Sequence, residues 1–127
     1  MKRRIRDLTS RRWSVSMDYR IGELNNYVRG WMGYFRLAMT NRRFSDLDEW
    51  FRRRLRQIRW KEWKRPRTRV ANLRRLGIAG QKAYEWGNSS RAYWRVAKSP
   101  ILHRALPTSY WEDLGVVFFR RAWDRFQ

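Results

Sequence analysis

The chain has 127 residues, enough for one domain with a buried core. It carries 31 Lys and Arg against 11 Asp and Glu, a formal net charge of +20 at pH 7. A charge this far from zero repels itself in the folded state, so it indicates a polyanionic partner. Most of the cations are arginine, which favours bidentate phosphate contacts and therefore nucleic acid over a lipid surface.

Composition also limits the class of protein. A hydrophobic content of 43% and an aromatic content of 17% predict a folded chain rather than a disordered one. The absence of cysteine excludes disulfides and thiolate metal sites. No uncharged run approaches the roughly 18 residues needed to span a bilayer, and the start MKRRIRDLTSRR has no apolar signal region. We therefore expect a protein of the cytosol or nucleoid.

The first part of the chain predicts two helices. Residues 2–8 form a short basic helix with Ile5 and Leu8 as its apolar contacts. Ser16 is a good N-cap for a second, longer helix. After it, apolar residues recur at alternating spacings of four and three: Met17, Ile21, Leu24, Val28, Trp31, Phe35 and Ala38. Residues 40–43 form a short connection, so this helix and the next are predicted to be antiparallel neighbours.

Three glycines interrupt the second helix, namely Gly22, Gly30 and Gly33. Each costs the helix up to about 1 kcal/mol relative to alanine. They therefore indicate the close approach of another helix or, as the alternative, of a phosphate backbone.

The stretch 44–65, FSDLDEWFRRRLRQIRWKEWKR, predicts the central helix. A winding of about 100° per residue places Phe44, Leu47, Phe51, Leu55 and Ile58 in one row that faces a core. Ser45 is its predicted N-cap. Three carboxylates then fall in the first turn, where the helix dipole favours negative charge: Asp46, Asp48 and Glu49. A metal site is the alternative for these acids, although no histidine or further acid follows at ligand spacing. Pro66 ends the helix because it disfavours the α conformation at Arg65.

Short helices are predicted from residue 68 to residue 106. Thr68 caps the first, whose apolar residues are Val70, Leu73 and Leu76 and which Gly77 closes. Residues 81–86 form the next, ending at Gly87, and residues 90–97 form another. Ser99 and Pro100 then open a helix over residues 101–106.

The last part of the chain completes an all-α domain. Ser109 and Glu112 form a capping-box pattern, and Gly115 is a C-terminal stop. Residues 116–126 predict a final helix, although residues 116–119, VVFF, would equally suit a short buried strand. We expect one helical-bundle domain over residues 1–127, with a long-helix core (1–77) and a short-helix extension (78–127).

The side of the central helix opposite its apolar row carries Arg52, Arg53, Arg56 and Arg59, with Trp60 and Trp63 among them. Aromatic rings between guanidinium groups, away from a core, predict a nucleic-acid surface on which unstacked bases lie. The alternative is a solvated basic face whose two tryptophans are packed by a neighbouring segment. Other polar residues predicted to face the partner are Arg20, Asn26, Arg29, Arg36, Lys61, Lys64, Arg65, Arg67 and Arg69.

Residues for catalysis are not apparent in the sequence. The single histidine, His103, has no second histidine or cysteine with which to share a metal or activate a nucleophile. The patterns G-x-S-x-G, Walker A and H-x-E do not occur. We expect the chain to have no cofactor and to catalyse nothing by itself.

Residues 24–35, LNNYVRGWMGYF, resemble the L-N-x-x-[IVL]-R-G-W-x-N-Y-F signature of group II intron reverse transcriptase/maturase proteins. Further matches follow in the same order: Asp48-Glu49-Trp50, WKEWK (60–64), AYEWGN (83–88), YWR (93–95) and SPILHRAL (99–106). Gly33 departs from the signature, where the family commonly has asparagine. The similarity covers nearly the whole chain.

The resemblance implies the C-terminal maturase-specific domain of that family, also called the thumb or X domain. Such a domain binds intron RNA for splicing and grips the RNA–DNA template–primer during reverse transcription. The family's Y-x-D-D palm motif and its H-N-H endonuclease domain do not occur in these residues. We therefore expect a piece of a larger reverse transcriptase, with fingers and palm upstream as partners.

Two rival classes fit the same composition. One is a DNA-binding or polymerase-accessory domain with no role in splicing. The other is a cationic, membrane-active helical protein.

Overall fold

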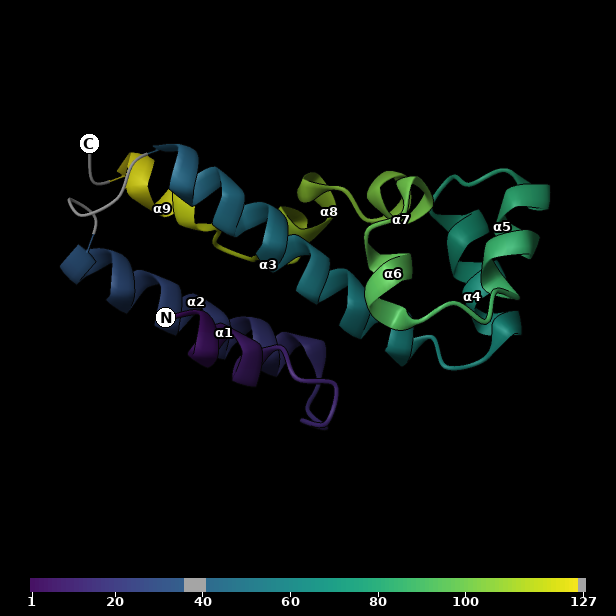
Figure 1. The fold of residues 1–127 in the computed structure, drawn as a ribbon, viewed down its shortest axis with the longest axis horizontal. Helices are drawn as coiled ribbons and strands as arrows, with labels where there is room; N and C mark the ends of the chain where they lie inside the picture. The colour runs from purple at the N-terminus through teal and green to yellow at the C-terminus, as the bar shows by residue number, and fades with distance from the viewer. Residues whose placement is uncertain (36–40, 126–127) are drawn as a thin grey trace.

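The computed structural model describes residues 1–35 and 41–125, which contain nine helices and no strand. The predicted all-α class is confirmed. In chain order the helices are α1 (Lys2–Leu8), α2 (Met17–Phe35), α3 (Asn41–Glu62), α4 (Pro66–Arg75), α5 (Gly80–Gly87), α6 (Tyr93–Ala97), α7 (Pro100–Ala105), α8 (Thr108–Asp113) and α9 (Phe119–Arg125). Figure 1 shows an elongated molecule in which α3 runs through the centre, with α1, α2 and α9 along its first part and α4 to α7 around its far end.

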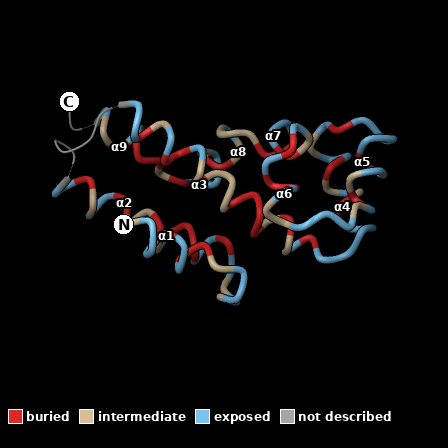
Figure 2. The backbone as a smooth tube through the Cα atoms, in the orientation of Figure 1, coloured by how far each residue is buried: buried red, intermediate tan, exposed pale blue. Residues whose placement is uncertain are grey.

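The central helix is buried on more than one side. Its predicted apolar row is confirmed, because Phe44, Leu47, Phe51, Leu55 and Ile58 are all at most 6% exposed. Residues outside the row, Arg56, Gln57 and Trp60, are equally buried. Both α9 and α6 pack against α3, so neighbours cover it from different directions (Figure 2). The sequence pattern predicts one buried face, whereas the fold surrounds the helix.

The two long helices share α9 as a neighbour. They run in roughly opposite directions (Figure 1), and each packs against α9. The ring of Phe119 meets Trp31 of α2 at 5.8 Å and Phe51 of α3 at 6.1 Å, edge-on in both cases. The α2 row is confirmed for the buried residues Met17, Ile21, Leu24 and Val28 and for the half-buried Trp31. Ala38 and the side chain of Phe35 lie outside the described residues.

Asn25 joins α2 to the segment before α9. Its Nδ2 donates to the Gly115 carbonyl at 2.7 Å, and its Oδ1 accepts from the Val117 N–H at 2.8 Å. These bonds satisfy the Gly115 carbonyl and the Val117 N–H in a segment, residues 115–117, that forms neither helix nor strand. The last helix therefore begins at Phe119 rather than at residue 116, and the strand alternative is wrong.

Asp48 caps α9 instead of lying in the first turn of its own helix. Because α3 begins at Asn41, the predicted capping role of Ser45 is wrong, and its hydroxyl accepts from Arg120 Nη1 at 3.2 Å. The buried Asp48 carboxylate accepts from the N–H groups of Phe119 at 2.8 Å and Arg120 at 3.0 Å. Burial raises the pKa of Asp48 to about 6, although these two hydrogen bonds act in the opposite direction.

Four of the predicted helix boundaries are confirmed. Ser16 accepts from the Tyr19 N–H at 3.1 Å, and Ser99 accepts from the Leu102 N–H at 3.3 Å. Gly77 and Gly115 follow α4 and α8 with φ angles of +94° and +97°, which only glycine adopts without strain.

Three other boundaries differ from prediction. Pro66 does end α3, but it also opens α4 at the first helical position, so Thr68 is not the cap. The helix predicted from Ser90 begins at Tyr93, because the preceding residues form a turn in which Ser89 Oγ accepts from the Arg91 N–H. The capping box is also absent from α8, where Pro107 precedes the helix and Glu112 pairs with Arg121 at 2.7 Å.

The prediction that another helix of this chain packs closely against the α2 glycines is wrong. A Cβ on Gly22, Gly30 or Gly33 would meet no described atom within 4 Å, once chain neighbours and the helix's own backbone are set aside. The crowded glycine is Gly87 of α5, where a Cβ would lie 2.4 Å from Val70 Cγ2 and 2.9 Å from the Val70 nitrogen. Gly87 therefore allows α5 to close against α4.

We expect Gly87→Ala to lower the free energy of unfolding by about 1 to 3 kcal/mol, because the added methyl group meets backbone that cannot move aside easily. The matched control is Gly22→Ala, also in a helix but in open space, which should be neutral or stabilising by up to about 1 kcal/mol. Urea unfolding of both variants measures the difference. Equal stabilities would contradict the close α4–α5 contact.

Candidate nucleic-acid interface

The predicted interface depends on the arginines of α3, and two of these hold other helices. Arg53 Nε donates to the Trp94 carbonyl of α6 at 3.0 Å, and Arg56 Nε donates to the Leu106 carbonyl after α7 at 3.0 Å. Carbonyls at helix C-termini lack intrahelical partners and carry the negative end of the helix dipole. Arg56 is only 5% exposed, and burial lowers its pKa to about 10. The prediction that Arg56 faces a partner is therefore wrong.

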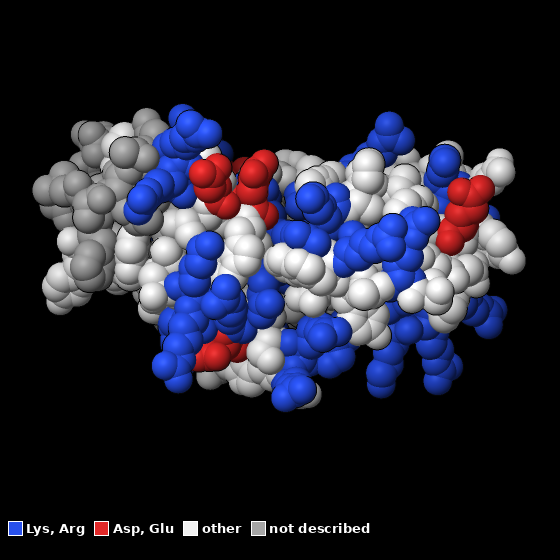
Figure 3. Space-filling model, viewed as in Figure 1, with Lys and Arg blue, Asp and Glu red and all other residues white. Residues whose placement is uncertain are grey.

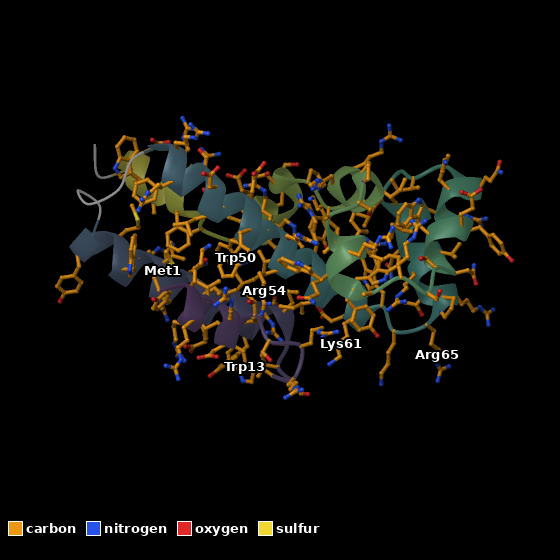
Figure 4. The ribbon with its side chains drawn as sticks, in the orientation of Figure 1. Met1, Trp13, Trp50, Arg54, Lys61 and Arg65 are labelled. Atoms are coloured by element: carbon orange, nitrogen blue, oxygen red, sulfur yellow. The ribbon has the colours of Figure 1, made fainter. Side chains whose placement is uncertain are left out.

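Two further arginines form hydrogen bonds with α1 and the loop after it. Arg20 is 3% exposed, contrary to prediction, and burial lowers its pKa. Its guanidinium donates to three carbonyls, those of Leu8 at 2.8 Å, Ser10 at 3.1 Å and Trp13 at 2.6 Å. Arg54, which was not predicted as a site residue, donates to the Thr9 hydroxyl at 3.0 Å and lies between α1 and α3 (Figure 4). Both arginines thus act as structural cations.

The predicted stacking tryptophans are part of the core. Trp60 is 0% exposed and Trp63 is 7% exposed, so the prediction that they present rings to a base is wrong. Arg69 of α4 is also buried. It donates from Nε and Nη2 to the Trp60 carbonyl at 3.2 and 3.1 Å, and its guanidinium lies 4.6 Å from the Trp60 ring centroid. The alternative of tryptophans packed by a neighbouring segment is confirmed.

Arg52 and Arg59 are half-buried on α3. Arg59 donates to the Tyr110 hydroxyl at 3.2 Å and pairs with Glu62 at 3.4 Å. The Arg52 guanidinium lies 5.6 Å from the Phe118 ring centroid. Both side chains therefore contact the protein while keeping part of their surface exposed.

The remaining predicted residues are exposed to different degrees. Asn26 and Arg29 are exposed on α2. Lys64, Arg65 and Arg67 are exposed where α3 gives way to α4, and Lys61 is half-buried beside them. Arg36 lies outside the described residues.

Exposed cations lie over much of the visible face of the molecule, and one group of them follows a single edge (Figure 3). Figure 3 shows Lys and Arg side chains along its lower margin, from α1 across the following loop to the start of α4, and Figure 4 places Lys61 and Arg65 there. Lys61 Nζ donates to the Arg11 carbonyl, and Lys61, Arg11 and Arg12 line one depression of about 380 Å³. We define the basic edge as Lys2, Arg3, Arg4, Arg6, Arg11, Arg12, Lys61, Lys64, Arg65 and Arg67.

Sequence reasoning missed six members of the basic edge. These are Lys2, Arg3, Arg4, Arg6, Arg11 and Arg12. The signal was present as the runs KRRIR and RR, but only the fold shows that Arg11 and Arg12 line a depression together with Lys61. It also places Lys2 and Arg6 over the Trp50 ring of α3, at 5.2 and 5.6 Å from the ring centroid. The basic edge offers point charges and guanidinium forks suited to phosphate oxygens.

His103 is the one histidine of the chain. His103 lines a cleft with Arg52, Arg53 and Arg56, and its pKa is lowered by burial and by the nearby arginines. Within residues 1–35 and 41–125, no three His, Asp or Glu residues converge in a way that could hold a metal ion. Over the same ranges, no helix combines the length and apolar character needed to cross a bilayer.

The fold and charge define a basic, all-α domain of a kind suited to polyanions. The family model for the group II intron maturase-specific domain matches residues 1–77, and the chain belongs to this family. Membership implies a maturase role in group II intron splicing, with group II intron RNA as the partner. No curated protein matches the chain. The match ends at the turn after α4, although Asn25 and Phe51 within it contact residues 115–119 beyond it.

Proposed function

We propose that this domain binds structured group II intron RNA through the basic edge and stabilises the RNA in its splicing-active fold. The observation that supports the proposal is the division between cations buried by the fold and cations left in solvent. Arg20, Arg56 and Arg69 are buried, whereas Lys64, Arg65 and Arg67 remain exposed. The splicing chemistry belongs to the RNA.

The expected contacts follow from the geometry of RNA. Phosphate neutralisation supplies most of the affinity of a basic surface. The deep, narrow major groove of an A-form helix excludes side chains, so such a helix is recognised by shape, phosphates and 2′-hydroxyls. The long cationic side chains of the basic edge suit this mode, although Asp7 and Glu23 line one depression together with Arg4 and Arg12. The open α2 glycine Gly30, next to the exposed Arg29, leaves room for a phosphate backbone as well.

We further propose the setting in which the domain works. It follows the fingers and palm of a reverse transcriptase, grips the template–primer duplex during DNA synthesis, and acts in the cytosol or nucleoid. The resemblance of residues 24–35 to the reverse transcriptase/maturase signature supports this assignment.

Competition binding at fixed salt tests the proposed function. Labelled intron RNA is bound to the domain and displaced by unlabelled intron RNA or by duplex DNA of equal length. We expect the RNA to compete at least tenfold better. Equal competition by the DNA would favour the rival DNA-binding or polymerase-accessory role.

A further inference from the structure

The helix pair α4–α5 forms a second surface feature, which adjoins the basic edge and shares Arg65 and Arg67 with it. A groove of about 730 Å³ runs between the two helices. The residues that line it include Arg65, Arg67, Val70, Arg74, Tyr84 and Asn88. Apolar groups form much of its wall, three exposed arginines line it, and none of these described lining residues is acidic.

Tyr84 gives the groove an aromatic surface that the core does not use. Its side chain is 63% exposed, an unusual state for a large ring. The ring is nevertheless held on fixed backbone, because the Tyr84 carbonyl accepts from Asn88 Nδ2 at 2.8 Å and from the Asn88 N–H at 3.2 Å. Gly87, one turn further on, is in close contact with Val70, which fixes the spacing of the two helices. The groove is therefore preformed.

The chemistry of the groove fits an unstacked nucleotide. A nucleobase of any identity can stack on an exposed aromatic ring, and phosphates on either side of it match the guanidinium groups of Arg67 and Arg74. The cleft lined by Arg53 and Trp94 is less suitable. There the Arg53 guanidinium already lies 3.8 Å from the Trp94 ring centroid, and the acids Asp46 and Glu49 line the same cleft.

We propose that the α4–α5 groove binds a single-stranded segment of RNA, with one base stacked on Tyr84 and the flanking phosphates held by Arg65, Arg67 and Arg74. This inference rests on the proposed function for the identity of the polymer. It adds a base-stacking site to a surface otherwise explained by phosphates alone. Sequence reasoning placed base stacking at Trp60 and Trp63, whereas the structure exposes a different ring.

The test compares base-bearing and base-free RNA. The probe is a labelled adenosine oligoribonucleotide of about eight nucleotides, with an abasic strand of the same length as the control. We expect the domain to bind the adenosine strand more tightly than the abasic strand. Tyr84→Ala should weaken adenosine binding by about 5- to 150-fold and leave abasic binding unchanged. Tyr84→Phe keeps the ring and should retain the parental affinity.

Salt dependence separates stacking from charge. Tyr84→Ala removes no charge, so its salt slope should equal that of the parent, whereas Arg74→Gln should lower the slope by about one phosphate contact. The groove assignment is overturned if the parent binds adenosine and abasic strands equally, or if Tyr84→Ala keeps the parental affinity. Intron RNA binding is measured in parallel. If intron RNA binds but the two strands do not differ, only the groove assignment fails, and if no RNA binds, the proposed function fails with it.

Discussion

Replacing Trp60 by alanine is expected to lower the free energy of unfolding by about 3 to 5 kcal/mol, because a tryptophan side chain is removed from a fully buried position. The ring lies edge-on to Trp63 at 6.1 Å and under the Arg69 guanidinium at 4.6 Å. Its loss leaves a cavity beside a buried cation. The end of α3 would then lose part of its contact with α4.

Trp60→Phe is the matched control. Trp60 Nε1 has no hydrogen-bond partner among the described residues, so phenylalanine loses ring area but no hydrogen bond. We expect Trp60→Phe to lower the free energy of unfolding by less than half as much as Trp60→Ala. Urea unfolding gives both stabilities, and RNA affinity is measured where each variant is folded. If Trp60→Ala were as stable as the parent but bound RNA more weakly, the Trp60 ring would not be part of the core and would instead contact the RNA.

The second large effect is expected at Arg20. Arg20→Ala should lower the free energy of unfolding by about 3 kcal/mol or more, because the carbonyls of Leu8, Ser10 and Trp13 lose a shared charged donor. A hydrogen bond from a charged group contributes about 1.5 to 3 kcal/mol, and water returning to the partly exposed carbonyls offsets part of the sum. Arg20→Lys should not restore stability, since an ammonium group lacks the planar fork that reaches all three carbonyls.

Arg29→Ala is the control for Arg20, since both residues are arginines of α2 and Arg29 is exposed. Its stability should remain within about 0.5 kcal/mol of the parent. Thermal and urea unfolding of the three variants measure the comparison. If Arg20→Ala and Arg29→Ala were equally stable, the structural assignment of Arg20 would be wrong.

Sequence periodicity predicted the core rows of α2 and α3 because each row depends only on winding along one helix. It misplaced Trp60 because a helical pattern identifies one buried face, and α3 has neighbours on several sides. The family resemblance at residues 24–35 pointed to the correct family, but the contacts of Asn25 with residues 115–117 became apparent only in the fold.

The exposure of the arginines was predicted less well than the core, for a reason particular to arginine. A guanidinium group on a polar helix face is normally assumed to face solvent, but its length and five donors let it reach backbone carbonyls of other elements. Arg53 bonds a residue 41 positions away, and Arg56 bonds one 50 positions away. Asp48 similarly caps a helix 71 residues later, whereas the local caps Ser16 and Ser99 were predicted correctly. Partners this distant leave no periodic signal.

The most direct measurement is the salt dependence of intron RNA binding for two variants of equal charge. One replaces Arg3, Arg12 and Lys64 of the basic edge by glutamine, and the other replaces the exposed Arg42, Arg104 and Arg120, which lie outside it. If the basic edge holds the RNA, the first variant should lose about 0.7 to 0.9 in the slope of log K against log salt for each phosphate contact removed. The second should keep the parental slope, and both should unfold at about the parental temperature. Equal slopes for the two variants would contradict binding through the basic edge.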